Sequence, residues 1–276
     1  MTMPAAGEDE AGFRALLEQV ARDRGFACGN YKDGCLRRRV AVRMRARGVA
    51  SYGEYAALLS GDAAEYDQLM DVLTINVTRL YRDAEVWNAL ADAVLPSLWE
   101  AAGNGFTAWS AGCASGEELY TLAALLHRHA ERSGTRRRLE RTLVIGTDID
   151  PGSLRAAAAA TYPESAFQEM PLDLRVRYFT REAPLTALPE LRSLVQVQRR
   201  DLLLDTPPVQ RCDLIVCRNL LIYLDREGQE RIFQRFHETL VPHGILVLGK
   251  VETMLGPARR LFTAVDQRQR IFRKVA

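Results

Sequence analysis

Two acidic side chains stand where the chain is expected to bind a small molecule. Glu118 follows the turn GCASG (112–116), which comes directly after the apolar run FTAWSA, and Asp148 ends the next apolar run, TLVIGTD. In an open α/β sheet, ligands bind at the carboxyl ends of the strands, and an acidic residue at the end of the second strand accepts hydrogen bonds from ribose hydroxyls. The two carboxylates therefore predict a pocket for a nucleoside.

The turn itself indicates which nucleoside. It lacks the G-x-G-x-x-G spacing that brings the backbone close to a pyrophosphate, and Glu117 and Glu118 follow Gly116 instead. Carboxylates repel phosphates and attract a cation, which favours S-adenosylmethionine (SAM), a cofactor with a ribose, an adenine, an amino group and a sulfonium. An alternative is that Ser115 and Glu118 form only a capping box at a helix start. The position of Asp148 favours the cofactor.

The hydrophobic pattern predicts the elements that position these residues. From residue 106 onward, short apolar runs alternate with helical stretches, as in a parallel sheet covered by helices on both faces. The runs are FTAWSAG, TLVIGTDID, CDLIVCRN and GILVLGK. In LVQVQ (194–198), apolar and polar residues alternate strictly, and the prolines before it mark turns. We therefore predict a small antiparallel insertion at about 178–204. LFTAVDQRQRIFRKV (261–275) reads as a closing hairpin.

The N-terminal part of the chain is helical instead. In the basic segment CLRRRVAVRMRAR (35–47), Leu36, Val40 and Met44 lie four residues apart on one helix face. No strand signal appears before residue 100. We therefore predict an α/β fold class: a small all-helical domain over 1–80, followed over 81–276 by a doubly wound, Rossmann-like domain that carries the inserted β-subdomain.

Composition places few demands beyond this fold. The 276 residues are 47% hydrophobic and 26% charged, with a net charge of +2, as in ordinary globular proteins. The five cysteines form no C-x-x-C pair, so neither a disulfide framework nor a metal site is expected. No apolar run reaches the length of a membrane span, and the acidic start MTMPAAGEDEAGF does not resemble a secretory signal. A cytoplasmic protein without membrane insertion is expected.

Four blocks resemble the CheR family of chemotaxis receptor methyltransferases. They are TINVTRLYRD (74–83), WSAGCASGEELY (109–120), GTDID (146–150) and DLIVCRNLLIYLD (213–225), in the order of the family. The segment YKDGCLRRRVAVRM (31–44) is similar to the family's helical domain. Some positions depart from the family: Leu80 and Tyr81 replace two phenylalanines, Leu119 a proline, and Val251 the serine of a G-x-S-E stretch that here reads GKVE.

The resemblance implies a function and a set of site residues. The function is SAM-dependent methylation of glutamate side chains, as methyl esters, on the cytoplasmic helical bundle of chemoreceptors, with S-adenosylhomocysteine as product. Catalytic roles fall to Arg82, Tyr223 and Arg218, although in isolation Arg82 reads as a surface arginine and Tyr223 as a core tyrosine. The cofactor contacts are Asn76, Thr78, Arg82, Gly112, Glu118, Asp148, Asp201, Leu202, Arg218 and Asn219.

Two further functions stay open. One is a non-catalytic SAM-binding regulator of a chemosensory-like pathway. The other is an RNA methyltransferase, because arginine-rich helices also bind phosphates; the modest net charge disfavours nucleic acid. A chemoreceptor substrate is acidic and would meet the densest basic segment, whose candidate contacts are Arg37, Arg38, Arg39, Arg43 and Arg47.

The expected partners are methyl-accepting chemotaxis proteins, bound by a monomer. Some members of the family dock a receptor's C-terminal peptide on the β-subdomain by strand addition, with a glycine-containing loop that lets the peptide backbone approach. Residues 178–204 contain no glycine here, and Pro184 and Pro189 shape the turns. We therefore expect no dependence on a C-terminal receptor tether.

Overall fold

The computed structural model describes residues 6–26, 28–74 and 78–275. The chain divides into two compact units, each described here by itself: residues 1–76 with 223–228, and residues 77–222 with 229–276. Asn76, one of the predicted cofactor contacts, lies outside the described residues.

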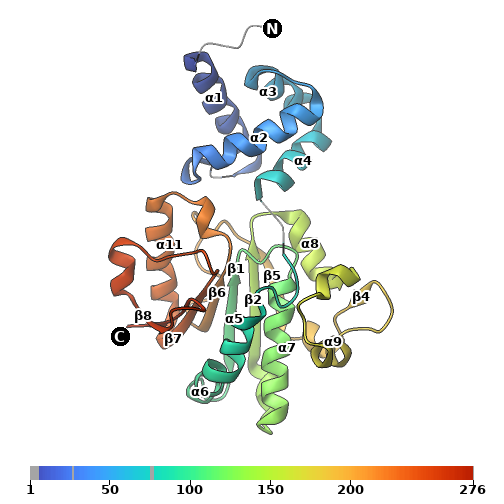
Figure 1. Ribbon diagram of the computed structural model, residues 1–276, viewed down its shortest axis with the longest axis vertical. Coiled ribbons are helices and arrows are strands. Elements are labelled where there is room, and N and C mark those ends of the chain that lie inside the picture. The colour runs from blue at the N-terminus through green and yellow to red at the C-terminus, as the bar shows by residue number, and fades with distance from the viewer. Residues whose placement is uncertain (1–5, 27, 75–77, 276) are drawn as a thin grey trace. The chain divides into compact units, whose positions relative to one another are not determined.

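The first unit is helical. Its helices are α1 (Ala6–Arg24), α2 (Asp33–Arg47), α3 (Tyr52–Gly61) and α4 (Ala63–Thr74), coloured blue to cyan in Figure 1. Leu36, Val40 and Met44 of α2 are buried, as their spacing predicts. Ser51 caps α3 in a capping box with Glu54. The all-helical character predicted for the N-terminal part is confirmed.

A short segment from far along the sequence belongs to this helical unit. The Lys32 backbone N–H donates to the Tyr223 carbonyl oxygen at 2.9 Å, and Tyr31 and Leu224 form an antiparallel bridge. The Arg39 guanidinium lies 4.6 Å from the centroid of the Tyr223 ring. Tyr223, a predicted catalytic residue, is therefore packed against the helices of the first unit, which the sequence pattern does not predict.

The second unit is built on one seven-stranded sheet. Its helices are α5 (Ala84–Ala89), α6 (Leu95–Ala101), α7 (Glu117–Arg132), α8 (Pro151–Ala159), α9 (Leu172–Tyr178), α10 (Pro189–Arg192) and α11 (Arg226–Thr239), of which the first residues of α11 group with the first unit. Its strands are β1 (Phe106–Ala111), β2 (Thr142–Asp148), β3 (Thr161–Tyr162), β4 (Leu185–Thr186), β5 (Val195–Arg199), β6 (Cys212–Cys217), β7 (Leu240–Leu248), β8 (Phe262–Asp266) and β9 (Ile271–Lys274).

The sheet has the order β5-β2-β1-β6-β7-β9-β8. Strands β5, β2, β1, β6 and β7 run parallel, while β9 is antiparallel to β7 and closes a hairpin with β8. The direction of the crossovers reverses between β1 and β6, so the predicted crevice lies at the carboxyl ends of these strands. The predicted doubly wound fold and the closing hairpin are confirmed (Figure 1).

One expected element is in a different place. Val195–Arg199 is not part of an insertion but the edge strand β5, parallel to β2. Val195 and Val197 are half-buried and Gln196 is exposed, so the two faces of β5 differ, and alternation fits this strand as well as it fits a small antiparallel sheet. The antiparallel pair is instead β3 with β4, two residues each, with the bridge Phe179–Ala187 beside it.

Both faces of the sheet are covered. Phe106 and Ala108 point to the face where α5, α6 and α7 pack, and they belong to the main hydrophobic core with Trp87, Trp99 and the apolar face of α7. Trp109, one residue along from Ala108, points to the other face, where its ring meets Phe236 of α11 at 5.4 Å between centroids. Alternate residues of β1 are thus buried on opposite faces, and the turn after β1 follows the carboxyl end of a central strand.

Candidate functional site

The turn after β1 has a conformation that requires glycine at two positions. Gly112 and Gly116 have φ angles of 80° and 92°. A Cβ atom on Gly112 would lie 2.7 Å from Leu220 Cδ2, and one on Gly116 would lie 2.9 Å from the Ala157 Cβ. Gly112 therefore lets the loop after β6 pack directly on the turn, and Gly116 lets α8 approach the start of α7.

Asp148 holds this turn in place. Its Oδ2 accepts a hydrogen bond from the Ala114 backbone N–H at 2.9 Å, and its Oδ1 accepts one from the Asp150 N–H at 3.0 Å. Burial raises the pKa of Asp148, and these backbone donors partly offset the rise. The carboxylate thus joins the end of β2 to the turn after β1, at the position predicted for a ribose.

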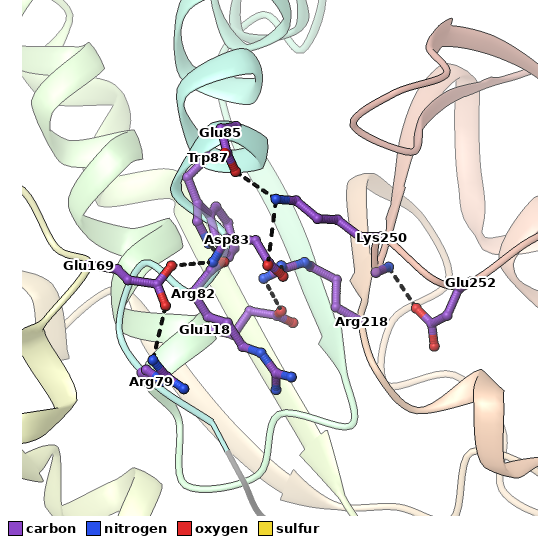
Figure 2. Close-up of polar contacts among 11 residues, drawn as sticks. Arg79, Arg82, Asp83, Glu85, Trp87, Glu118, Glu169, Arg218, Lys250 and Glu252 are labelled. Carbon is purple, nitrogen blue, oxygen red and sulfur yellow. Dashed lines mark hydrogen bonds and ion pairs between the residues drawn. The ribbon is translucent and has the colours of Figure 1, made fainter.

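Glu118 lies on the first turn of α7 between two guanidinium groups. Its Oε1 accepts a hydrogen bond from the Ser110 hydroxyl at 2.8 Å, and its Oε2 lies 3.6 Å from Arg218. Burial raises the pKa of Glu118, while Arg218, Ser110 and Arg82 act in the opposite direction. Figure 2 shows Arg82 and Arg218 on different sides of the Glu118 carboxylate.

The capping-box interpretation of this stretch is wrong. Gly116 occupies the N-cap position of α7 without a side-chain cap, and the Ser115 hydroxyl donates to Glu117 Oε2 at 2.7 Å. Glu118 is turned toward Ser110 instead of back toward Ser115. Its carboxylate is therefore directed at the carboxyl ends of the strands, where the predicted pocket lies.

Arg218 is held inside the unit by ion pairs. Its side chain is only 2% exposed, and its guanidinium lies 2.6 Å from the Asp83 carboxylate and 5.3 Å from the centroid of the Trp87 ring. Within the described residues, the buried Arg218 Nε has no hydrogen-bond partner. The geometry makes Arg218 a counter-ion that links Asp83 to Glu118.

The segment that carries Arg82 is held in an uncommon conformation. Tyr81 and Asp83 both have φ angles of 60°, which cost non-glycine residues about 1–3 kcal/mol each. Three contacts fix the backbone: Leu80 N–H donates to the Ala166 carbonyl, Tyr81 N–H to the Thr121 hydroxyl, and Asp83 N–H to Glu169 Oε2 at 2.7 Å. The strain is thus concentrated beside Arg82.

Glu169 and Glu252 are positioning residues that sequence reasoning missed. Glu169 also accepts a hydrogen bond from Arg79, at 3.3 Å (Figure 2). Glu252 is buried and accepts backbone N–H bonds from Gly249, Leu220 and Leu221 at 2.6–2.9 Å, so it ties the loops after β6 and β7 together. The GKVE stretch was the one signal for Glu252, and nothing in the sequence marks Glu169.

The remaining predicted cofactor residues lie in loops. Thr78 opens the segment that leads to Arg82, and Asn219 follows Arg218 with a φ angle of 60°. Asp201 folds its own loop, because its Oδ1 accepts the Leu203 N–H at 2.7 Å. Leu202 directs its carbonyl oxygen to Arg235 of α11. No contact in the structure tests the roles predicted for these side chains toward the cofactor.

Most arginines of α2 are committed within the helical unit. Arg39 is buried and donates to the Leu73 carbonyl. Arg43 binds the buried carboxylate of Glu65 through two nitrogens. Arg37 pairs with Glu10, and Arg47 with Asp62. Arg38 and Arg45 are exposed, with the exposed Val42 between them on the same helix face.

The described residues include neither a metal-binding cluster nor a helix suited to span a membrane. Among them, no group of three or more histidine, cysteine, aspartate or glutamate residues is arranged to hold a metal ion. None of the helices over these residues combines the length and the apolar character needed to cross a bilayer.

Comparison with protein families gives two matches that together span most of the chain. Residues 76–271 match the model described as "CheR methyltransferase, SAM binding domain", and residues 11–74 match "CheR methyltransferase, all-alpha domain". The boundary between the two matches falls within residues 74–76, next to the division between the compact units.

Individual relatives agree with these matches. A "Chemotaxis protein methyltransferase" of Listeria monocytogenes is 34% identical over 90% of this chain and 92% of its own length. "Chemotaxis protein methyltransferase 1" of Pseudomonas aeruginosa is 30% identical over 91% and 92%. An "Uncharacterized 104.1 kDa protein in hypE 3'region" of Rhodobacter capsulatus is 37% identical over 88% of this chain, which spans only 25% of that protein.

Proposed function

Because this chain belongs to the CheR methyltransferase family, we propose that it transfers the methyl group of SAM to glutamate side chains of bacterial chemoreceptors. This methylation would serve adaptation in a chemotaxis or chemosensory-like pathway. The observation that carries the proposal is the placement of Glu118 and Asp148 at the carboxyl ends of β1 and β2. Two carboxylates there fit a cofactor that is cationic and has no phosphate. Glu118 would hold the methionine moiety and Asp148 the ribose, with the loop of Asp201 and Leu202 beside the adenine.

The chemistry requires few side chains. The cofactor supplies a methyl group on a sulfonium, which a carboxylate oxygen attacks directly. A glutamate has an ordinary pKa of about 4.3, so the substrate is already ionised at neutral pH and needs no general base. Arg82 and Tyr223 would orient that carboxylate. Exclusion of water would favour the reaction, because water stabilises the separated charges.

Two of the four histidines fit this view. His127 is buried on α7, and its Nδ1 lies 3.2 Å from the hydroxyl of Tyr178 on α9. Burial lowers the pKa of His127. His237 contacts the Val275 carbonyl in the C-terminal hairpin. Neither contact involves the residues around Glu118, as expected for a reaction without a general base.

Labelled methyl transfer tests the proposal against both alternatives. Purified protein and methyl-labelled SAM are incubated with receptor-containing membranes, and in parallel with total RNA. We expect label in the receptor band and none in RNA. Label in RNA alone would favour the nucleic-acid function, and SAM binding without transfer to either would favour a regulatory module.

Glu118 sets how SAM affinity depends on pH. Its pKa is raised by burial in the free protein, and a bound cation would stabilise the ionised form and lower that pKa again. SAM binding therefore releases a proton at any pH where the free Glu118 carboxyl is protonated. SAM affinity is full above the raised pKa of Glu118 and falls as the pH drops through that pKa. Calorimetry at a series of pH values, from neutral pH down to the ordinary glutamate pKa of about 4.3, should show this loss. Glu118→Gln should bind SAM more weakly at pH 7.5, and its SAM affinity should no longer depend on pH. A pH dependence as steep as that of the wild type would contradict the assignment of Glu118 to the cofactor.

The exposed face of α2 would carry part of the receptor affinity. Arg38 and Arg45 lie on this face, whereas Arg39 and Arg43 are committed to Leu73 and Glu65 and would report on stability when replaced. We expect Arg38→Glu with Arg45→Glu to raise the apparent KM for receptor several-fold at low salt, with a smaller difference at high salt because exposed charges are screened. SAM affinity should not change. A KM equal to that of the wild type at low salt would remove this face from the interface.

The chain should not need a receptor's C-terminal peptide as a tether. The antiparallel insertion has strands of only two residues, and residues 178–204 contain no glycine. Calorimetry with peptides copied from the C-termini of the host's receptors should therefore detect no binding. Micromolar binding that is lost when residues 179–187 are altered would show that the insertion does dock a peptide.

A further inference from the structure

Asp83 stands at the N-cap position of α5, but its side chain does not cap that helix. An aspartate at this position ordinarily accepts a hydrogen bond from a backbone N–H of the first turn. Asp83 makes no such bond, and its carboxylate is turned to the Arg218 guanidinium instead. Its backbone is fixed separately, because Glu169 accepts the Asp83 N–H at 2.7 Å. The Asp83 carboxylate is therefore committed to Arg218 and not to the local helix.

The two terminal nitrogens of Arg218 meet two carboxylates at unequal distances (Figure 2). Nη2 donates a hydrogen bond to Asp83 Oδ2 at 2.6 Å, whereas Nη1 lies 3.6 Å from Glu118 Oε2, beyond the length of a hydrogen bond. Lys250 Nζ also approaches Asp83, but at 3.7 Å and from a side chain that is 40% exposed. Asp83 is thus the main partner of Arg218, and Glu118 is the more distant one.

This division leaves one oxygen of Glu118 able to accept a further hydrogen bond. Oε1 already accepts a hydrogen bond from the Ser110 hydroxyl at 2.8 Å. Oε2 is attracted by Arg218 without being hydrogen-bonded to it. Burial raises the pKa of Glu118, and Arg218 is the strongest of the groups that oppose the rise. Arg218 would therefore compete with a cationic ligand for Oε2 if it moved closer to Glu118.

We propose that Asp83 is a positioning residue for the cofactor: it draws Arg218 away from Glu118 and so leaves Glu118 Oε2 for the amino group of SAM. The inference rests on the proposed function, in which Glu118 holds the methionine moiety. A protonated amino group has N–H donors only, and a carboxylate oxygen that accepts from it makes a charge-assisted hydrogen bond. That bond requires an oxygen that a guanidinium has not already occupied.

Calorimetry with two ligands separates this role from general stability. S-adenosylhomocysteine carries the same amino group as SAM, whereas methylthioadenosine keeps the adenosine and the thioether but lacks the amino acid part. Asp83→Asn removes the charge and keeps the backbone, because asparagine tolerates the φ angle of 60° found here. We expect S-adenosylhomocysteine to bind roughly tenfold more weakly, the scale of one hydrogen bond to a charged group. Methylthioadenosine should bind as tightly as it does to the wild type.

Glu85→Gln is the matched control for the loss of charge. Glu85 lies in the first turn of α5, but its side chain is 64% exposed and pairs with Lys250 at 2.7 Å. It has no contact with Arg218 in the structure. The Glu85→Gln variant should therefore bind both ligands with the affinities of the wild type.

The Arg218→Met background decides whether Asp83 acts through Arg218. In that background, Asp83→Asn should cause no further loss of S-adenosylhomocysteine affinity, since no guanidinium remains to close on Glu118. An equal loss in both backgrounds would show that Asp83 meets the amino group itself, and would overturn the inference. Weaker binding of methylthioadenosine to Asp83→Asn would also overturn it, because the substitution would then have disturbed the whole pocket.

The outcomes separate this inference from the proposed function. Binding of S-adenosylhomocysteine needs no receptor, so calorimetry decides the role of Asp83 whether or not a receptor is methylated. A wild-type protein that methylates no receptor contradicts the proposed function. An S-adenosylhomocysteine affinity that is unchanged in Asp83→Asn contradicts this inference and leaves the proposed function intact.

Discussion

Replacing Arg82 with methionine is expected to lower kcat by about a hundredfold while SAM affinity changes only a few-fold, because loss of one donor to a reacting oxygen typically has this size. Arg82 follows a strained backbone segment fixed by Thr121 and Glu169. Its guanidinium acts on Glu118 electrostatically, yet Arg218 is the larger influence there. The role that we propose for Arg82 is to orient the substrate carboxylate.

Arg79→Met is the matched control for Arg82. Arg79 lies in the same segment but pairs with Glu169 at 3.3 Å and is partly exposed. The Arg79→Met variant should therefore retain most of the wild-type turnover. Tyr223→Phe, measured in parallel, should also lower kcat without weakening SAM binding if its hydroxyl aims the substrate. A parallel loss of SAM affinity and turnover in Arg82→Met would assign Arg82 to the cofactor instead.

Replacing Asp148 with alanine is expected to weaken SAM binding by roughly ten- to a hundredfold. The variant removes the acceptor predicted for the ribose hydroxyls and leaves the Ala114 and Asp150 N–H groups without their partner. Each unsatisfied group of this kind costs about 1–3 kcal/mol. Isothermal calorimetry with SAM and with S-adenosylhomocysteine measures the loss directly.

Asp213→Ala separates cofactor binding from general stability. Asp213 is also a partly buried carboxylate that accepts a backbone N–H, from Thr107 at 2.8 Å. It lies at the amino end of β6, whereas Asp148 lies at the carboxyl end of the parallel strand β2. Both variants should melt at lower temperature, but only Asp148→Ala should lose SAM affinity. Equal affinities in the two folded variants would contradict the assignment of the site.

The sequence predicts those parts of the fold and site that depend on local pattern. Buried parallel strands are continuous apolar runs, so four strands and the position of Asp148 at a strand end follow directly. Asp150 and Pro151 mark the start of α8, where Asp150 caps two backbone N–H groups. The direction of Glu118 depends on which serine it meets, and spacing alone favoured the wrong one.

The rest depends on contacts between distant residues. β5 alternates like a half-exposed strand of any sheet, so its pairing with β2 is fixed only when the fold closes. Glu169 meets Asp83 across 86 positions of sequence, and Glu252 meets Leu221 across 31. The α2 arginines look alike in sequence, but their partners differ. Arg39 donates to the Leu73 carbonyl and Arg43 binds Glu65, whereas Arg38 is exposed.

The chemical form of the transferred methyl group tests the central claim most directly. Receptor-containing membranes are labelled with methyl-tritiated SAM and the purified protein, washed, and treated with alkali, after which volatile methanol is counted. A carboxylate methyl ester releases its label as methanol, and Asp148→Ala should release far less than the wild type. Label that enters the receptor but resists alkali would show methylation of nitrogen or sulfur, and would contradict a carboxylate methyltransferase.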